Sequence, residues 1–275
     1  MKKSIIPILA CLTLLVFSCN RDRVVFDGEL ASSIDNGLAE SEFSAIRNMV
    51  DAEAQADSNV YGKNSGLSGL YCPGASVTVV VTSTTTATMT IDFGSGSNCV
   101  DGRLRTGRLV ADFVGKWKDA GSTVTIVPEN YTVAGYSFSF NKVITHNGLN
   151  GQGDPSWTTV VTNAVLSHPT NGSSSWECTR VTTWTDGYGD MDVSNNAYEV
   201  TGTASGVSRN GVPYTAVVDM DRPLRILANC PNIVSGVLGL KPQDRQTREI
   251  DYGNGACDKD AVLTVGNYTT IITLP

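Results

Sequence analysis

The stretch Thr86-Ala87-Thr88-Met89-Thr90-Ile91-Asp92-Phe93 decides the fold class, because polar and apolar side chains alternate along it one by one. A period of two places successive side chains on opposite faces of a β-strand. Residues 268–274, close to the C-terminal end, repeat this alternation. Both stretches therefore predict strands of a sheet that has one packed face and one mostly polar face.

Similar runs recur between these two stretches and are separated by turn words such as Asn147-Gly148 and Asn210-Gly211. Consecutive strands at this spacing, with no helix between them, indicate an antiparallel meander. The chain is therefore predicted to be all-β, and a β-sandwich or flattened barrel is the expected closure. The predicted runs are 104–114, 122–127, 131–145, 157–166, 176–183, 191–203, 212–220, 233–240 and 261–265.

One segment, residues 37–57, has a helical period instead. Its apolar residues fall on one stripe, and its first acidic residues suit the positive end of a helix. The stripe contains Ala39, Phe43, Ile46, Val50 and Ala54, and the acids are Glu40 and Glu42. We therefore expect a polar tether over residues 19–36, one short helix with a loop over 37–70, and an antiparallel β domain over 71–275.

An internal repeat is the most informative feature of the sequence. Ile91-Asp92-Phe93-Gly94-Ser95-Gly96 precedes Cys99, and Ile250-Asp251-Tyr252-Gly253-Asn254-Gly255 precedes Cys257. A Cys-Pro pair opens each copy, at residue 72 and at residue 230, so both cysteine separations are 27, from 99 − 72 and 257 − 230. The chain therefore contains a duplicated strand-turn-strand unit, near 72–99 and near 230–257.

The duplicated cysteines predict two disulfides, Cys72 to Cys99 and Cys230 to Cys257, because paired cysteines in an exported chain are typical of disulfides. Four cysteines allow three pairings, and the repeat favours this one. Metal binding is the rival reading, but it requires clustered ligands such as Cys-x-x-Cys. Cys178 is left over and is expected to be a buried free thiol.

Asp92 and Asp251 occupy equivalent positions in the two copies. Two carboxylates can act as acid and base in sugar hydrolysis. Equivalent positions in a duplicated unit favour a shared structural role instead, in which each carboxylate braces a turn through a backbone hydrogen bond. No catalytic residue and no cofactor is assigned from the sequence.

Two further groups of side chains were weighed as sites. Asp186, Asp190 and Asp192 have alternating oxygen side chains that could wrap a calcium ion, although their spacing departs from the EF-hand pattern and also suits an acidic hairpin tip. Four tryptophans could stack against sugars on an exposed sheet face, or could be buried anchors of the core. They are Trp117, Trp157, Trp176 and Trp184.

The N-terminus has the features of an export signal. Lys2 and Lys3 precede an apolar run that ends in Val16-Phe17-Ser18-Cys19. Because the run is shorter than the roughly 20 residues of a membrane span, residues 1–18 are expected to be a signal peptide. The last four residues resemble the lipobox of bacterial lipoproteins, which implies cleavage before Cys19 and a lipid on its sulfur. The alternative is an ordinary secretory signal that has a cysteine by chance.

The charge balance argues against nucleic acid as a partner. The 275 residues carry a net charge of −7, and removal of residues 1–18 changes it to 18 − 27, or −9. No basic stripe with interleaved aromatic residues is present, so a phosphate backbone is a poor match.

Taken together, the lipobox, the short helix, the threonine-rich strands and the duplicated word resemble β-rich lipoproteins of the Bacteroidetes type. The resemblance implies an outer-membrane lipoprotein of the cell envelope and supplies no catalytic residues. In such lipoproteins a run of acids after the lipidated cysteine accompanies surface export. Asn20, Arg21, Asp22 and Arg23 do not form one, so the periplasmic face is favoured.

Three functions remain open at this point. The first is a non-catalytic envelope protein, held to the membrane by the lipid on Cys19, that has a structural part or binds a glycan or protein. The second is a glycan-processing hydrolase whose paired carboxylates would meet in a pocket. The third is a fimbrial or adhesin subunit, for which residues 268–274 are the candidate exchangeable strand.

Overall fold

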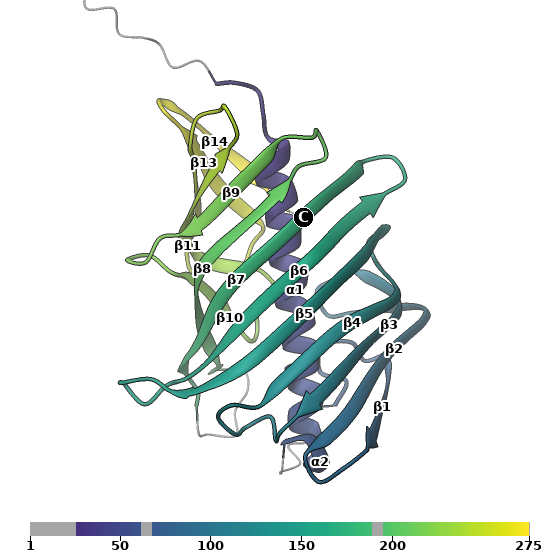
Figure 1. Ribbon diagram of the computed structural model, residues 1–275. Helices are drawn as coiled ribbons and strands as arrows, with labels where there is room; N and C mark the ends of the chain where they lie inside the picture. Colours follow the sequence, from purple (N-terminus) through teal and green to yellow (C-terminus); the bar gives the residue numbers. More distant parts are fainter. Residues whose placement is uncertain (1–25, 62–67, 189–194, 275) are drawn as a thin grey trace, which may run out of the picture.

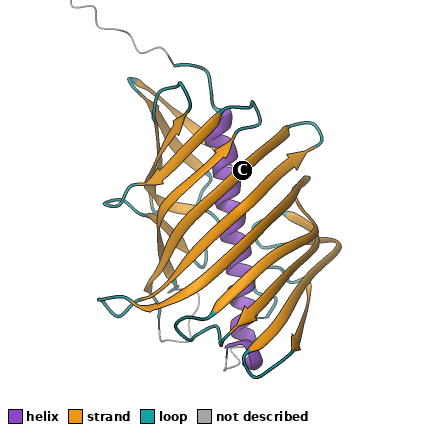
Figure 2. Ribbon diagram, in the orientation of Figure 1, coloured by secondary structure: helices purple, strands orange, loops and turns teal. Residues whose placement is uncertain are grey.

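The computed structural model describes residues 26–61, 68–188 and 195–274. It contains one long helix, α1 (Ala31–Ala56), a single further turn, α2 (Ser58–Tyr61), and one large antiparallel sheet. Figure 1 and Figure 2 show the sheet curving around α1, so that strands lie on both sides of the helix. The signal segment and Cys19 lie outside the described residues.

The sheet is built from fourteen strands in chain order. Their bounds are β1 (Ser76–Val81), β2 (Thr86–Asn98), β3 (Leu104–Val114), β4 (Thr123–Val133), β5 (Tyr136–Leu149), β6 (Pro155–His168), β7 (Gly172–Asp186), β8 (Ala197–Val207), β9 (Pro213–Val218), β10 (Leu224–Leu227), β11 (Ile233–Pro242), β12 (Arg248–Asn254), β13 (Asp260–Val265) and β14 (Tyr268–Thr273).

Neighbouring strands pair antiparallel from β1 to β14, which confirms the predicted meander. Among the described residues, the strand order departs from chain order between β8 and β11, where β9 and β10 lie end to end. β9 pairs with one half of β8 and one half of β11, and β10 pairs with the other half of each. β9 and β10 are therefore one strand position that is interrupted at residues 219–223.

The period of two is confirmed where the sequence showed it most clearly. Ala87, Met89, Ile91 and Phe93 are all buried, while the threonines between them face outward. The predicted run 131–145 is wrong in one respect, since it spans the turn between β4 and β5, where Ala134 and Gly135 both have positive φ. β10 was not predicted as a separate strand.

Helix α1 begins at Ala31 rather than at residue 37, so the end of the predicted tether is helical. Its 26 residues make a rod about 39 Å long. The apolar stripe predicted from the sequence is buried, but so are most of the polar residues on the other sides of the helix. α1 is therefore a central element, and the sheet wraps it instead of packing on one face.

The two predicted disulfides are present, between Cys72 and Cys99 and between Cys230 and Cys257, with Cα atoms 4.2 and 5.8 Å apart. The first closes the open end of the β1–β2 hairpin, and the second closes that of the β11–β12 hairpin. The duplicated unit of the sequence is therefore a duplicated, stapled hairpin.

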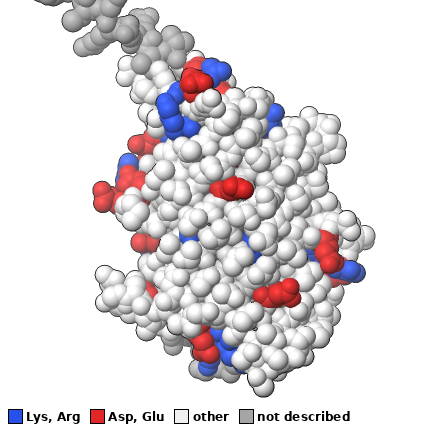
Figure 3. All heavy atoms as spheres, viewed as in Figure 1, with Lys and Arg blue, Asp and Glu red and all other residues white. Residues whose placement is uncertain are grey.

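Charge is unevenly distributed on the outside of the sheet. Figure 3 shows the face over β5 to β8, where charged side chains lie mostly toward the margins and the centre carries few. Among the described residues, no helix is long and apolar enough to cross a membrane.

Candidate apolar binding pocket

A pocket of about 330 Å³ opens beside α1, between the two stapled hairpins. Its floor is the one side of the helix that the strands leave partly uncovered. Ser41, Ser44, Ala45 and Asn48 form this floor, and each of them is only partly buried. Residues spaced by three and four positions share one face of a helix, and small side chains on that face leave room above it.

The walls of the pocket come from the two copies of the duplicated unit. Leu70, Tyr71 and the loop that begins at Cys99 form one wall, and the segment from Ala228 to Ile233, which includes Cys230, forms the other. Each disulfide therefore supplies one cysteine to a wall. Leu70 and Val100 lie at the rim with 40% and 62% of their surface exposed, which makes the mouth apolar.

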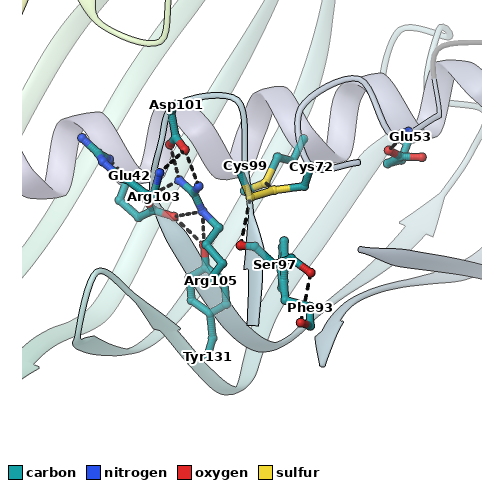
Figure 4. Close-up of a disulfide and its surroundings, with 12 residues drawn as sticks. Glu42, Glu53, Cys72, Phe93, Ser97, Cys99, Asp101, Arg103, Arg105 and Tyr131 are labelled. Atoms are coloured by element: carbon teal, nitrogen blue, oxygen red, sulfur yellow. Dashed lines mark hydrogen bonds and ion pairs between the residues drawn. A yellow bond between two sulfur atoms is a disulfide. The ribbon is translucent and has the colours of Figure 1, made fainter. Parts of the chain in front are cut away.

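Among the described residues of the lining, the charged side chains are Asp101 and Arg105, which form an ion pair with each other. Arg105 Nη2 lies 2.6 Å from Asp101 Oδ2 and 2.8 Å from Glu42 Oε2 of the helix (Figure 4). Burial opposes the charged form of Asp101, but its hydrogen bonds with Arg105 prevail and lower its pKa. Asp101 is therefore ionised, and Asp101, Arg105 and Glu42 form one internally paired cluster.

The cluster extends below the pocket to a tyrosine. The hydroxyl of Tyr131 donates to Glu42 Oε1, and burial together with this carboxylate raises the pKa of Tyr131 well above its ordinary value. Tyr71, in the wall, has a pKa raised to about 12, mainly by burial. Neither phenol ionises near neutral pH, so neither adds a charge to the site. Its other polar side chains are serines and asparagines at positions 41, 44, 48, 229 and 232.

Asp92 and Asp251 each accept a hydrogen bond from the backbone N–H two residues on, at 2.8 and 2.9 Å. This is the bracing role predicted from their equivalence. The location differs, because the Gly-x-Gly motifs lie at irregularities of the strand pairing, inside β2 and at the end of β12, and not at hairpin turns. Gly94 and Gly253 have φ of 58° and 88° there, which glycine adopts without strain.

The carboxylates considered for hydrolysis have separate partners. Asp92 Oδ2 lies 2.7 Å from Arg108 Nε, and Asp186 Oδ2 lies 2.7 Å from Arg225 Nη2. None of Asp92, Asp186 and Asp251 lines the apolar pocket. Asp190 and Asp192 of the calcium candidate lie outside the described residues, and within the described ranges no cluster of three metal-ligating side chains occurs.

The four tryptophans do not form a stacking platform, because all of them are buried in the core. Trp117 and Trp176 donate their indole N–H groups to Asp51 and Asn36 of α1. Trp157 lies between Trp117 and Trp184, with ring centres 6.3 and 6.4 Å away. The large rings fill the space between the curved sheet and the single helix, so they are not exposed on the surface.

Cys178 is a buried free thiol, as expected, and burial raises its pKa to about 12. The thiol is therefore protonated near neutral pH.

A second hollow, of about 460 Å³, lies on the sheet across β6, β7, β8 and β9. All its lining residues belong to these strands, so it is a depression in one surface. The pocket beside α1 has walls from separate elements and is the stronger candidate site.

Sequence reasoning identified the cysteines of the pocket walls but not the pocket. One sequence feature could have indicated it. On the helix face opposite the apolar stripe, the side chains are small or polar, namely Ser41, Ser44, Ala45 and Asn48. Comparison of the chain with models of known protein families, with curated proteins and with solved structures found no match.

Proposed function

We propose that this chain is a non-catalytic binding protein of the cell envelope, and that it holds a small, mostly apolar molecule in the pocket beside α1. The observation that carries the proposal is the pocket itself, which has about 330 Å³ of space and two walls fixed by disulfides. Pockets for small molecules begin near this size and combine apolar walls with a few polar groups.

The lining favours an apolar ligand over a glycan. Leu70, Val100 and Ile233 would contact the ligand, and burial of apolar surface stabilises a complex by roughly 25 cal/mol per Å². A sugar placed there would bury many hydroxyl groups against few partners, which costs free energy for each unpaired group. The serines and asparagines of the lining suit a ligand with one polar end.

A fluorescence titration tests the pocket. The neutral probe N-phenyl-1-naphthylamine should bind the chain from Asn20 onward, which includes every described residue. Ala45→Phe places a ring on the floor of the pocket and should weaken probe binding at least tenfold. Ala120→Phe, on an exposed turn, is the matched control and should bind as the unaltered chain does. Equal binding by all three chains would exclude the pocket as the site.

We also propose that a lipid on Cys19 anchors the chain to the outer membrane, with the periplasmic face favoured, as in the Bacteroidetes-type lipoproteins that the sequence resembles. Two or more acyl chains make such an anchor stable. An alkyne fatty acid fed to producing cells should label the protein and fail to label Cys19→Ser. Cys178→Ser should keep the label, and labelling that persists in Cys19→Ser would refute the anchor.

A further inference from the structure

A separate, smaller cavity of about 40 Å³ lies between α1 and the inner face of β5, β6, β7 and β8, with Ile226 of β10 also in its lining. A cavity needs roughly 10 to 15 Å³ to hold one water molecule, so there is room for a few waters or for one small ion. Ser44, Asn48 and Ile226 lie between this cavity and the apolar pocket, since they line both.

The ionisable side chains that line the cavity are unbalanced in charge. Arg47 and Arg180 are cationic, Lys142 carries a positive charge when it is protonated, and Glu40 is the one carboxylate among the described residues of the lining. Glu40 forms an ion pair with Arg180. Across the described ranges, Arg47 and Lys142 form no ion pair, although they are only 6% and 1% exposed. A buried cation without a counterion costs several kcal/mol.

Hydrogen-bond donors of the same lining lack partners. Arg47 Nε and Nη2, Arg180 Nε and Thr159 Oγ1 are buried and form no hydrogen bond within the described residues. Arg47 lies over the rings of Trp157 and Tyr198, at 4.9 and 5.1 Å from their centres. The rings offset part of its charge, but a guanidinium N–H also needs an acceptor.

The protein itself does not provide that acceptor as an anion. Burial keeps the pKa of Cys178 at about 12 and raises the pKa of Tyr198, so both side chains stay neutral. Glu42 is engaged by Arg103, Arg105 and Tyr131. Asp51 accepts from Trp117 and Gln55. Among the described residues, no carboxylate therefore lies within ion-pair distance of Arg47 or Lys142.

We propose that the cavity is a binding site for one small monovalent anion, of the size of chloride or nitrate, held by Arg47, Lys142 and the free donors of Arg180 and Thr159. The anion would neutralise the excess positive charge and accept the unpartnered hydrogen bonds at the same time. Water alone would accept the hydrogen bonds of these donors, but it would not neutralise the excess positive charge. The proposal is independent of what the apolar pocket binds, because Arg47 does not line that pocket.

Thermal unfolding of the purified protein tests the site. Sodium chloride or nitrate is exchanged for sodium gluconate at constant ionic strength, because gluconate is too large for the cavity. The unfolding midpoint should rise with chloride concentration, by about 3 to 5 °C for each tenfold increase above the dissociation constant. The same midpoint in chloride and in gluconate would overturn the proposal.

Two variants separate this site from general salt effects. Arg47→Met should abolish the difference between chloride and gluconate. Arg222→Met removes an exposed arginine and should keep it. If Arg47→Met does not fold, crystals of the unaltered protein soaked in bromide decide the question. An anomalous peak in the cavity supports the site, and water alone in the cavity overturns it.

Discussion

At the residue scale, the stability of the molecule depends on charges buried around α1. Glu40, Glu42 and Asp35 of the helix each pair with an arginine of the strands or their connections, namely Arg180, Arg105 and Arg209. A buried pair stabilises little against an apolar replacement, but loss of one partner is costly because the other charge stays buried. These pairs therefore fix how the helix sits within the sheet.

Glu42→Gln should destabilise the fold by about 3 kcal/mol, since it leaves Arg105 with Asp101 alone and weakens the contact with Tyr131. Urea unfolding monitored by tryptophan fluorescence measures the change. Glu129→Gln, which removes an exposed partner of Arg108, is the control and should have no measurable effect. Equal stability of both variants would show that the Glu42 cluster is not structural.

Because Lys142 is buried, we expect the free energy of unfolding to depend on pH. Burial lowers the pKa of Lys142 to about 7. Cys178 opposes this shift, Arg47 adds to it and Glu42 opposes it, in decreasing order of influence. An unfolded lysine has a pKa of about 10.4. From about pH 7 to 9 the unfolded chain therefore binds more protons than the folded chain, so the free energy of unfolding should rise with pH.

Urea unfolding at a series of pH values in gluconate should show this rise, and Lys142→Met should make it shallower. Lys118→Met, at an exposed position, should leave the slope unchanged. A slope that is identical in Lys142→Met and the unaltered chain would mean that Lys142 does not carry the effect.

At the element scale, the duplicated hairpin is what the sequence predicted best. A repeated sequence motif with equal cysteine spacing predicted two similar local structures. The period of two along the strands predicted which side chains face inward. The bulges at Gly94 and Gly253 were mistaken for turns, because glycine-rich words occur in both. The turn at Ala134 was missed because a non-glycine residue with positive φ gives little signal.

Removal of the first disulfide tests the role of the hairpins as pocket walls. Cys72→Ala combined with Cys99→Ala should lower the free energy of unfolding by roughly 3 kcal/mol, as expected for a loop of this length. It should also weaken binding of the apolar probe, because Cys99 and Val100 line the pocket. Cys178→Ala, a buried cysteine outside the pocket, should leave probe binding unchanged. Full probe affinity in the double variant would show that the staple does not shape the site.

At the scale of the whole molecule, one sheet wraps one helix. The sequence predicted the class and the meander, because both follow from local patterns. It did not reveal that α1 would be buried on nearly every side, since charged residues such as Arg47, Asp51 and Glu53 are usually exposed. Arg47 lies over the rings of Trp157 and Tyr198, and Asp51 accepts from Trp117. These contacts join residues far apart in the chain, and no local pattern encodes them.

The same limit applied to the candidate site. The pocket requires that segments near residues 71, 100 and 230 converge on the middle of α1, and this convergence is a property of the curved sheet. The cavity with Arg47 and Lys142 likewise joins the helix to strands β5 to β8. Lys142 was not among the residues predicted to form a site. Inward and outward side chains alternate along β5, and this alternation places Lys142 on the inner face of the sheet.

The claim that the pocket beside α1 holds an apolar molecule can be tested on protein isolated from its own cell envelope. Native mass spectrometry should detect an added mass on the unaltered protein and on Ala120→Phe, and organic solvent should release it. Ala45→Phe should carry no such mass. If Ala45→Phe retains the same mass, or if none of the three proteins carries one and none binds the apolar probe, the pocket is not a ligand site.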